Sequence, residues 1–283
     1  MRNWKPNQKT KVILEQIQEV MSRFNVQMTV RQVYYQMVAN GFIKNEKSEY
    51  QKMSRILTNA RYAGIISWDD IIDGTRKPHI PLTFKDIKER LRLASDNFFL
   101  DKWTSQDYYI ELMTEKDAIS TIVAPICQEY QITRSVGRGF NSATAIKGMA
   151  DRFLASDKQG VLLYLGDHDP EGLYISEEDI PKRLAEFSCY PEIIRIGLNL
   201  EQVRQYNPPA QFAKEGSSNK KWYVKNYGTE ECWEVDALRP DIMANLVEDS
   251  INEYRDIDEW LLTEEEELRQ KVKLEKIIRS LKL

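Results

Sequence analysis

The chain has 283 residues and a net charge of −4, and 42% of its residues are hydrophobic, so it can form two packed domains of ordinary size. No apolar stretch approaches the roughly 18 residues that a membrane helix requires. Cys127, Cys189 and Cys232 are far apart and lack CxxC spacing, which argues against a disulfide framework and a zinc site and favours buried thiols. Because residues 1–5 are polar and lack the apolar core of a secretory signal, we expect a cytoplasmic protein.

The charge is divided unevenly along the chain. Residues 1–95 hold 17 Lys and Arg against 9 Asp and Glu, a net charge of +8, whereas the remainder holds 23 against 35, a net charge of −12. A basic front region is typical of a protein that binds a polyanion. The same asymmetry also arises by chance on solvated helix faces, so the charge favours a polyanion-binding protein but does not establish one.

The front region begins with three predicted helices. Apolar residues at helical spacing predict the first over residues 9–24. Thr29 and Gln32 form a capping-box pattern that opens the second, predicted over residues 30–40. A similar signal, Ser48 with Gln51, opens a third helix that extends to about residue 62 and stops at Gly64.

Short β-prone segments follow these helices. They lie at residues 65–68 and 71–72, beside Asp73-Gly74, which is a strong turn dipeptide. A small hairpin is therefore predicted after the third helix. Three helices and a hairpin make a winged helix, which we assign to residues 1–95.

Arg31 and Tyr35 lie four residues apart on one face of the second predicted helix, next to the apolar stripe that contains Tyr34. This spacing predicts that Tyr34 is packed and that Tyr35 is exposed. A tyrosine beside an arginine on a DNA-facing helix suits attack on a phosphodiester, with the guanidinium holding the phosphate. Packing is the alternative role of such a pair. A tyrosine pKa of about 10 means that a nucleophilic role needs a base or metal nearby.

The rear region alternates strands and helices, which predicts an α/β domain with a parallel sheet flanked by helices. Strands are predicted over 108–113, 132–136, 161–165 and 192–196, with helices from 115 to an interruption near Pro125, over 141–154, over 177–187 and from Thr263. We assign this domain to residues 108–283, after a linker over residues 96–107.

Acidic residues follow two of these strands. Glu115 comes after the first, and Asp167 and Asp169 come after the third, in the run Gly-Asp-His-Asp-Pro-Glu-Gly of residues 166–172. Because parallel strands end at one edge of a sheet, we expect the three carboxylates to lie together and to bind one or two Mg²⁺ ions, with Mn²⁺ as a substitute. A plain strand-to-loop turn is the alternative for this run. The side chain of His168, between the aspartates, is expected to face outward.

These residues resemble known motifs. Glu115 with residues 166–172 resembles the Toprim domain of topoisomerases, bacterial primases and several nucleases. Residues 29–35 resemble the Arg-x-x-Tyr/Phe-Tyr motif of the topoisomerase VI A subunit and its meiotic double-strand-break relative, and residues 233–238 resemble that family's Glu-hydrophobic-Asp-Ala-Leu segment. The resemblance covers roughly residues 28–245, and the short chain is most similar to the Mini-A proteins of mobile genetic elements.

The resemblance implies a catabolite-activator-like winged helix that bears the catalytic tyrosine, followed by a Toprim domain. It implies a type IIB topoisomerase-like enzyme in which Tyr35 joins a 5′ phosphate, Arg31 holds the phosphate, and Glu115, Asp167 and Asp169 bind Mg²⁺. A double-strand break needs two tyrosines, hence a homodimer on double-stranded DNA, and the resemblance implies that each site combines one subunit's tyrosine with the other's metal cluster. A bacterial or archaeal cell is the implied setting, with a phage or plasmid as one source of the gene.

One departure from the family pattern and one missing motif bear on these expectations. Residues 137–140 are followed by Asn-Ser-Ala where the family has Pro-Asp, so DNA contact by this loop is in doubt. The sequence has no Gly-x-x-x-x-Gly-Lys-Ser/Thr pattern, so no nucleotide site is predicted, and an ATPase partner is compatible with the chain but not implied. Two alternatives stay open: a Toprim nuclease in which water attacks the phosphate, and a non-catalytic DNA-binding or replication factor.

Overall fold

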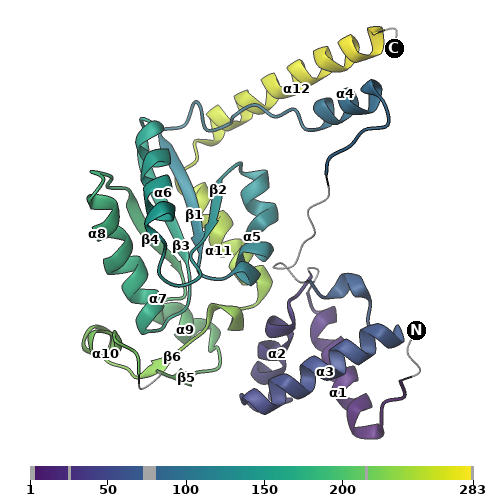
Figure 1. Ribbon diagram of the computed structural model, residues 1–283, viewed down its shortest axis with the longest axis vertical. Coiled ribbons are helices and arrows are strands. Elements are labelled where there is room, and N and C mark those ends of the chain that lie inside the picture. Colours follow the sequence, from purple (N-terminus) through teal and green to yellow (C-terminus); the bar gives the residue numbers. More distant parts are fainter. Residues whose placement is uncertain (1–3, 25–26, 73–80, 214–215, 282–283) are drawn as a thin grey trace.

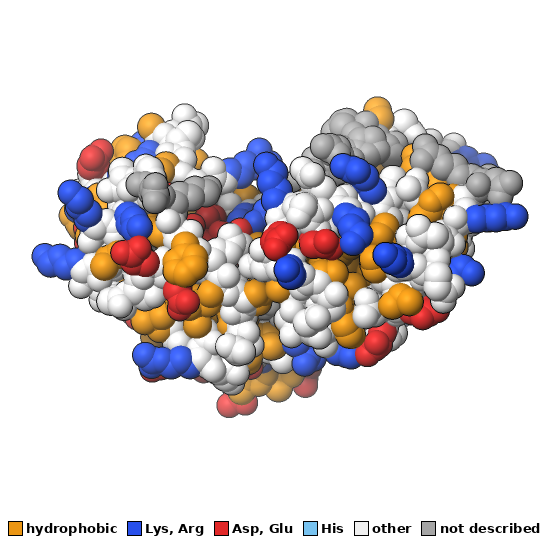
Figure 2. All heavy atoms as spheres, turned by 90° about the horizontal axis from the view of Figure 1, so that it is seen from below, with side chains coloured by type: hydrophobic (Ala, Val, Ile, Leu, Met, Phe, Trp, Pro, Cys, Tyr) orange, Lys and Arg blue, Asp and Glu red, His pale blue; other side chains and the backbone are white. Residues whose placement is uncertain are grey.

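The computed structural model describes residues 4–24, 27–72, 81–213 and 216–281. Figure 1 shows a small helical body near the N-terminus and a larger body built around a sheet, with a long helix leading to the C-terminus. The surface is hollowed between the two bodies, and Lys and Arg side chains stand on the wall of this hollow (Figure 2). Within the described ranges, no helix has both the length and the apolar character needed to cross a membrane.

The larger body contains four parallel strands in the order β2-β1-β3-β4. They are β1 (Tyr108–Thr114), β2 (Thr133–Val136), β3 (Gln159–Leu165) and β4 (Glu192–Gly197). In the register of the two central strands, Thr114 pairs with Leu165, so β1 and β3 end level with each other. The loops that follow them therefore start at the same edge of the sheet.

Helices cover both faces of this sheet, which confirms the predicted α/β arrangement. They are α5 (Asp117–Glu129), α6 (Ala143–Ala155), α7 (Pro170–Tyr174), a π turn (Ile175–Asp179), α8 (Ile180–Ala185), α9 (Leu200–Tyr206) and α11 (Pro240–Asn252), whereas α10 (Lys220–Tyr227) packs beside α7. Leu112 and Leu163 pack with α5 and α11, whereas Met113 and Tyr164 pack with α6 and α8. The strands therefore bury apolar side chains on both faces, as central parallel strands do. A short antiparallel pair, β5 (Gln211–Phe212) and β6 (Glu231–Cys232), lies apart from the sheet.

The front body is built from α1 (Gln8–Ser22), α2 (Val30–Ala39) and α3 (Lys47–Ala63), as the helical spacing predicts. The capping box of α2 is confirmed. The backbone N–H of Gln32 donates to Thr29 Oγ1 over 3.2 Å, and the backbone N–H of Thr29 donates to Gln32 Oε1 over 2.8 Å. The Ser48 cap is wrong, because α3 begins at Lys47, two residues earlier than a Ser48 cap implies, and Glu46 occupies the N-cap position. Gly64 ends α3 with φ of +76°, a conformation that glycine adopts without strain.

In the described residues after α3, the predicted β-prone segment at 65–68 is not a strand, and a helical turn over residues 68–70 precedes residues 71–72. Ser67 caps a 3₁₀ turn over Trp68–Asp70, because its hydroxyl accepts from the Asp69 N–H while its own N–H donates to Asp70. Ile71 then makes a single bridge to Met28. The predicted Asp73-Gly74 turn lies outside the described residues, so the winged helix stays a prediction.

Three helix bounds in the rear region differ from the predictions by more than two residues. The helix predicted to break near Pro125 runs on to Glu129, because Val123 and Cys127 on either side of the proline both pack in the core. The helix predicted over 177–187 starts at Pro170. The C-terminal helix α12 (Ile257–Ser280) starts before Thr263, because Asp256 accepts from the N–H groups of its first turn. Beside α12 lies α4 (Ile87–Asp96), at a distance from α1–α3 (Figure 1).

Candidate functional site: an acidic pocket beside a tyrosine

The predicted metal ligands line one pocket at the edge where β1 and β3 end. This pocket has a volume of about 690 Å³, and Glu115, Asp167 and Asp169 all line it, together with Arg31 of the front body. The Asp167 N–H donates to Glu115 Oε2 over 2.9 Å, which ties the loop after β3 to the loop after β1. The level ends of two parallel strands thus bring Glu115 close to Asp167, which lies 52 positions later in the sequence, and to Asp169 in the same loop.

Two glycines let the carboxylates approach the backbone closely. A Cβ atom at position 166 would lie 2.8 Å from Glu115 Oε2, and a Cβ atom at position 172 would lie 2.6 Å from the carbonyl oxygen of Asp167. Asp169 caps α7, because its Oδ1 accepts from the Gly172 N–H over 2.7 Å, and Pro170 occupies the first helical position. The glycines and the proline of this run therefore shape the pocket as well as ending the strand.

Burial, together with the crowding of like charges, raises the pKa values of two of these acids. Burial, followed by the charges of Asp167 and Asp169, raises the pKa of Glu115 to about 8. Burial, followed by the charge of Asp167, raises the pKa of Asp169 to about 6. Repulsion of this kind is what a bound cation would relieve.

The raised pKa of Glu115 predicts how stability depends on pH when divalent ions are absent. Its pKa in the folded state, about 8, lies above the ordinary value of 4.5, so the folded chain binds this proton more tightly than the unfolded chain does. This contribution is complete below about pH 4.5 and is lost as the pH rises toward 8. We expect urea unfolding in EDTA to give a free energy of unfolding that falls by on the order of 2 kcal/mol between pH 5 and pH 8, and Glu115→Gln to remove most of that fall. A free energy that is flat over this range in the unchanged protein would contradict the assignment.

A lysine that the sequence analysis missed is bound to three acidic side chains here. Lys116 Nζ lies 2.6 Å from Asp167 Oδ2, 3.1 Å from Glu234 Oε2 and 3.2 Å from Asp236 Oδ2. Burial alone would lower the pKa of Lys116, but the charges of Asp167, Asp236 and Glu234 raise it, so the ammonium group stays charged. The only sequence signal for these two extra acids is that both belong to residues 233–238, which resemble a family segment.

The pocket contains carboxylates, which are the ligands that a hard divalent cation prefers. In the described residues, however, these carboxylates are not arranged around a metal ion. Five carboxylates line the pocket together with the cationic side chains of Arg31 and Lys116; they belong to Glu115, Asp167, Asp169, Glu171 and Glu234. A sixth carboxylate, of Asp236, pairs with both cations. Among the described residues, the buried Asp236 Oδ1 finds no hydrogen-bond partner. Over the ranges that the structure covers, however, no three acidic, histidine or cysteine side chains are grouped so that they could hold a metal ion. Magnesium binding would therefore require Asp167 to exchange Lys116 for the metal.

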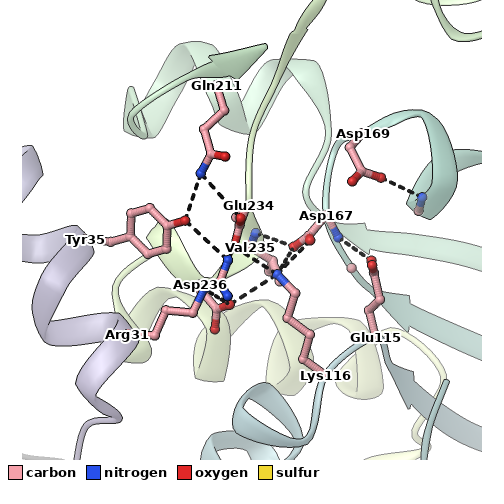
Figure 3. Close-up of polar contacts among 12 residues, drawn as sticks. Arg31, Tyr35, Glu115, Lys116, Asp167, Asp169, Gln211, Glu234, Val235 and Asp236 are labelled. Carbon is pink, nitrogen blue, oxygen red and sulfur yellow. Dashed lines mark hydrogen bonds and ion pairs between the residues drawn. The ribbon is translucent and has the colours of Figure 1, made fainter. Parts of the chain in front are cut away.

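Tyr35 lies at the rim of this pocket, and the prediction that it is exposed is wrong. Its side chain is buried, with 3% of the residue exposed, and Gln211 Nε2 donates to its phenol oxygen over 2.8 Å (Figure 3). Burial raises the pKa of Tyr35 above its ordinary value, and the charge of Glu234 adds to this. The rear body covers the face of α2 that helical spacing alone would leave to solvent. Tyr34 is packed, as predicted.

Arg31 joins the two bodies. Its guanidinium pairs with Glu234, its Nε lies 3.2 Å from Asp236 Oδ2, and its Nη2 lies 3.5 Å from the phenol oxygen of Tyr35. Burial alone would lower the pKa of Arg31, but the charges of Glu234, Tyr35 and Asp236 raise it. Arg31, Gln211 and Glu234 line both the acidic pocket and a second one, of about 610 Å³, that contains Tyr35. The two pockets therefore adjoin.

His168 is buried, contrary to the prediction that it faces outward. Only 1% of the residue is exposed, its Nδ1 lies 2.9 Å from the Tyr223 hydroxyl, and the rings of Tyr227 and Trp233 pack edge-on against it. Burial, followed by the charge of Arg195, lowers its pKa to about 4, so the ring is neutral at neutral pH. Backbone hydrogen bonds between His168 and Trp233 in both directions, of 2.8 and 3.0 Å, hold the aspartate loop against residues 233–238. The histidine thus packs beneath the pocket.

The fold and the site define an α/β protein with an acidic pocket at the carboxyl edge of a parallel sheet and a tyrosine–arginine pair at the rim of that pocket. No family model matches the chain, and no curated protein matches it. Its function therefore has to be inferred from the chemistry of this site.

Proposed function

We propose that the chain is a Mg²⁺-dependent DNA-cleaving transesterase of the type IIB topoisomerase kind, with a winged-helix domain followed by a Toprim domain. The observation that carries this proposal is the placement of Tyr35 and Arg31 beside the pocket lined by the three predicted metal ligands. Acting on double-stranded DNA as a homodimer, in the cytoplasm of a bacterial or archaeal cell, the enzyme would cut one strand with each tyrosine. The basic front region and the hollow lined with Lys and Arg side chains support a polyanionic substrate (Figure 2).

In the proposed reaction the phenol oxygen of Tyr35 attacks a backbone phosphorus of DNA. The new bond joins the phenol oxygen to phosphorus, the bond from phosphorus to the 3′ oxygen breaks, the phenol proton passes to water, and the 3′ oxygen takes up a proton as it leaves. Arg31 offsets the negative charge of the phosphate, and its charge also favours the phenolate form of Tyr35. When bound by Glu115, Asp167 and Asp169, a divalent ion supplies charge stabilisation at the phosphate and at the leaving oxygen.

Supercoiled plasmid incubated with the protein and Mg²⁺ or Mn²⁺, then denatured with and without protease, tests this proposal. We expect cut DNA to enter a gel freely only after protease treatment, and EDTA to prevent cutting. Glu115→Gln should lower cutting by about a hundredfold or more, because it removes a metal ligand. Asp151→Asn is the matched control, because Asp151 forms an exposed ion pair with Lys147 on α6, away from the pocket.

Other outcomes of this assay support the other readings. Cut DNA that runs freely without protease would point to a hydrolytic nuclease, a second candidate favoured by one observation: Glu115 and Asp169 are only half-buried, whereas Tyr35 is buried. DNA binding that is sensitive to salt, without nicking in either metal, would point to a non-catalytic DNA-binding factor.

A further inference from the structure

The helices α4 and α12 form an arm that extends from the larger body. They lie side by side, past the sheet and far from α1–α3 (Figure 1). Of the 24 residues of α12, all of which the structure describes, only Trp260 is buried, and in the equally well described α4 only Ser95 is buried. Most helices in proteins are stabilised by packing an apolar face against another element. The arm therefore lacks the packed face that a long helix ordinarily has.

An apolar stripe lies on the exposed surface of α12. Ile257, Leu261, Leu268 and Val272 follow one another at intervals of four, seven and four residues, so they lie on one face of the helix. Each of these residues is between 43% and 65% exposed, although α4 lies beside α12. The face is thus left uncovered by the rest of the arm. A stripe with this spacing is typical of a helix that packs against a second helix.

The charges of α12 are divided between its two halves. Residues 257–267 contain six acidic side chains and no basic one, whereas residues 268–280 contain five basic side chains and one acidic one. This division suits the dipole of a single helix. It also means that two antiparallel copies of α12 attract each other, because the acidic half of each lies along the basic half of the other. Two parallel copies would place like charges together and repel.

One antiparallel register satisfies the apolar and the charged positions together. It sets Leu268 beside Val272 of the partner subunit, and twofold symmetry makes this contact twice. In the same register Glu265 lies within one residue of the level of Lys276 of the partner subunit. The centre of the contact is therefore apolar, and opposite charges flank it.

We infer that α12 is a self-association surface, through which two copies of this chain pair antiparallel about a twofold axis near residues 268–272. A second copy is the partner that fits, because the acidic and basic halves of α12 complement each other only in that pairing. The inference names an interface for the homodimer of the proposed function, but it does not rest on DNA cleavage.

Sedimentation velocity of the full chain over a range of concentrations measures this association. We expect a dimer, and we expect Leu268→Glu to raise its dissociation constant by about a hundredfold or more, because each copy loses an apolar contact and places a charge in the interface. Leu154→Glu is the matched control, since Leu154 is 55% exposed against 65% for Leu268 but lies on α6. Circular dichroism should show that both variants stay folded, because both positions are exposed.

Disulfide crosslinking between two separately tagged copies tests the direction of the pairing. Antiparallel pairing places residue 261 of one copy beside residue 279 of the other. Under oxidation we expect a copy with Leu261→Cys to crosslink to a copy with Arg279→Cys. Two copies that both have Leu261→Cys should not crosslink, as they would in a parallel pair. The three natural cysteines are buried, so they should contribute little background.

A chain that stays monomeric at every concentration tested would overturn the inference. So would a dimer that Leu268→Glu leaves intact, or one in which residue 261 crosslinks to residue 261 and not to residue 279. None of these results decides whether DNA is cut, which the plasmid assay measures separately. A dimer that has the expected crosslinks but forms no covalent DNA complex would overturn the proposed function and leave this interface standing, so the two failures are distinguishable.

Discussion

Replacing Tyr35 with phenylalanine is expected to lower the formation of covalent protein–DNA complexes by about a thousandfold or more, because phenylalanine has no oxygen that can attack phosphorus. The cost in stability should be small. The lost phenol oxygen leaves Gln211 with Glu234 as its remaining side-chain partner, so the free energy of unfolding should fall by about 1 kcal/mol. Denaturing gels with and without protease measure the first effect, and urea unfolding measures the second.

Tyr34→Phe is the matched control for this substitution. Tyr34 lies on the same helix, and its phenol oxygen lies 3.0 Å from Asn45 Oδ1 and 3.2 Å from the Glu46 carbonyl oxygen, either of which can accept its proton. Its loss should cost a similar amount of stability and leave DNA cutting unchanged. Cutting by Tyr35→Phe at the rate of the unchanged protein would remove the covalent mechanism and leave the hydrolytic nuclease in its place.

The largest loss of stability is expected from Lys116→Met. Methionine has a similar length but no charge, so the carboxylates of Asp167, Glu234 and Asp236 would lose the cation between them. Removing one partner of a buried ion pair costs about 3 to 5 kcal/mol, because the remaining charges stay buried without compensation. Urea unfolding in EDTA, at a pH near 7, measures this difference.

Magnesium should restore part of that stability. Because Lys116 no longer competes for Asp167 in the variant, Mg²⁺ should raise the free energy of unfolding more in Lys116→Met than in the unchanged protein. Lys147→Met is the control, since its exposed ion pair with Asp151 contributes less than about 1 kcal/mol. An effect of Lys116→Met no larger than that of the control, or an equal response of both proteins to Mg²⁺, would show that the lysine and a metal do not share this site.

The sequence predicts the sheet and the meeting of its acidic residues because both follow from local patterns. Alternation of strands with helices indicates parallel pairing, and parallel strands bring the residues after their ends to one edge. Glu115, Asp167 and Asp169 could therefore be placed in one pocket before any contact was known. The capping box of α2 is equally local, because Thr29 and Gln32 are three residues apart.

What the sequence does not predict depends on contacts between distant segments. Arg31 meets Glu234 across 203 positions, and the same contact buries Tyr35, which helical spacing alone leaves exposed. Lys116 follows Glu115 in the sequence, and no local pattern distinguishes it from other charged residues. Its ion pairs with Glu234 and Asp236 form only because the fold brings residues 233–238 next to it. His168 is buried for the same reason, since its aromatic neighbours come from residues 223–233.

The most direct test of the account is to identify the atom that becomes joined to DNA. The protein is incubated with plasmid and Mg²⁺, denatured, and digested with nuclease and protease, and the peptides that retain a nucleotide are sequenced by mass spectrometry. From the proposed transesterification we expect a nucleotide joined through its 5′ phosphate to Tyr35. DNA cut in the same reaction with no adduct, or with the adduct on another residue such as Tyr34, would contradict it.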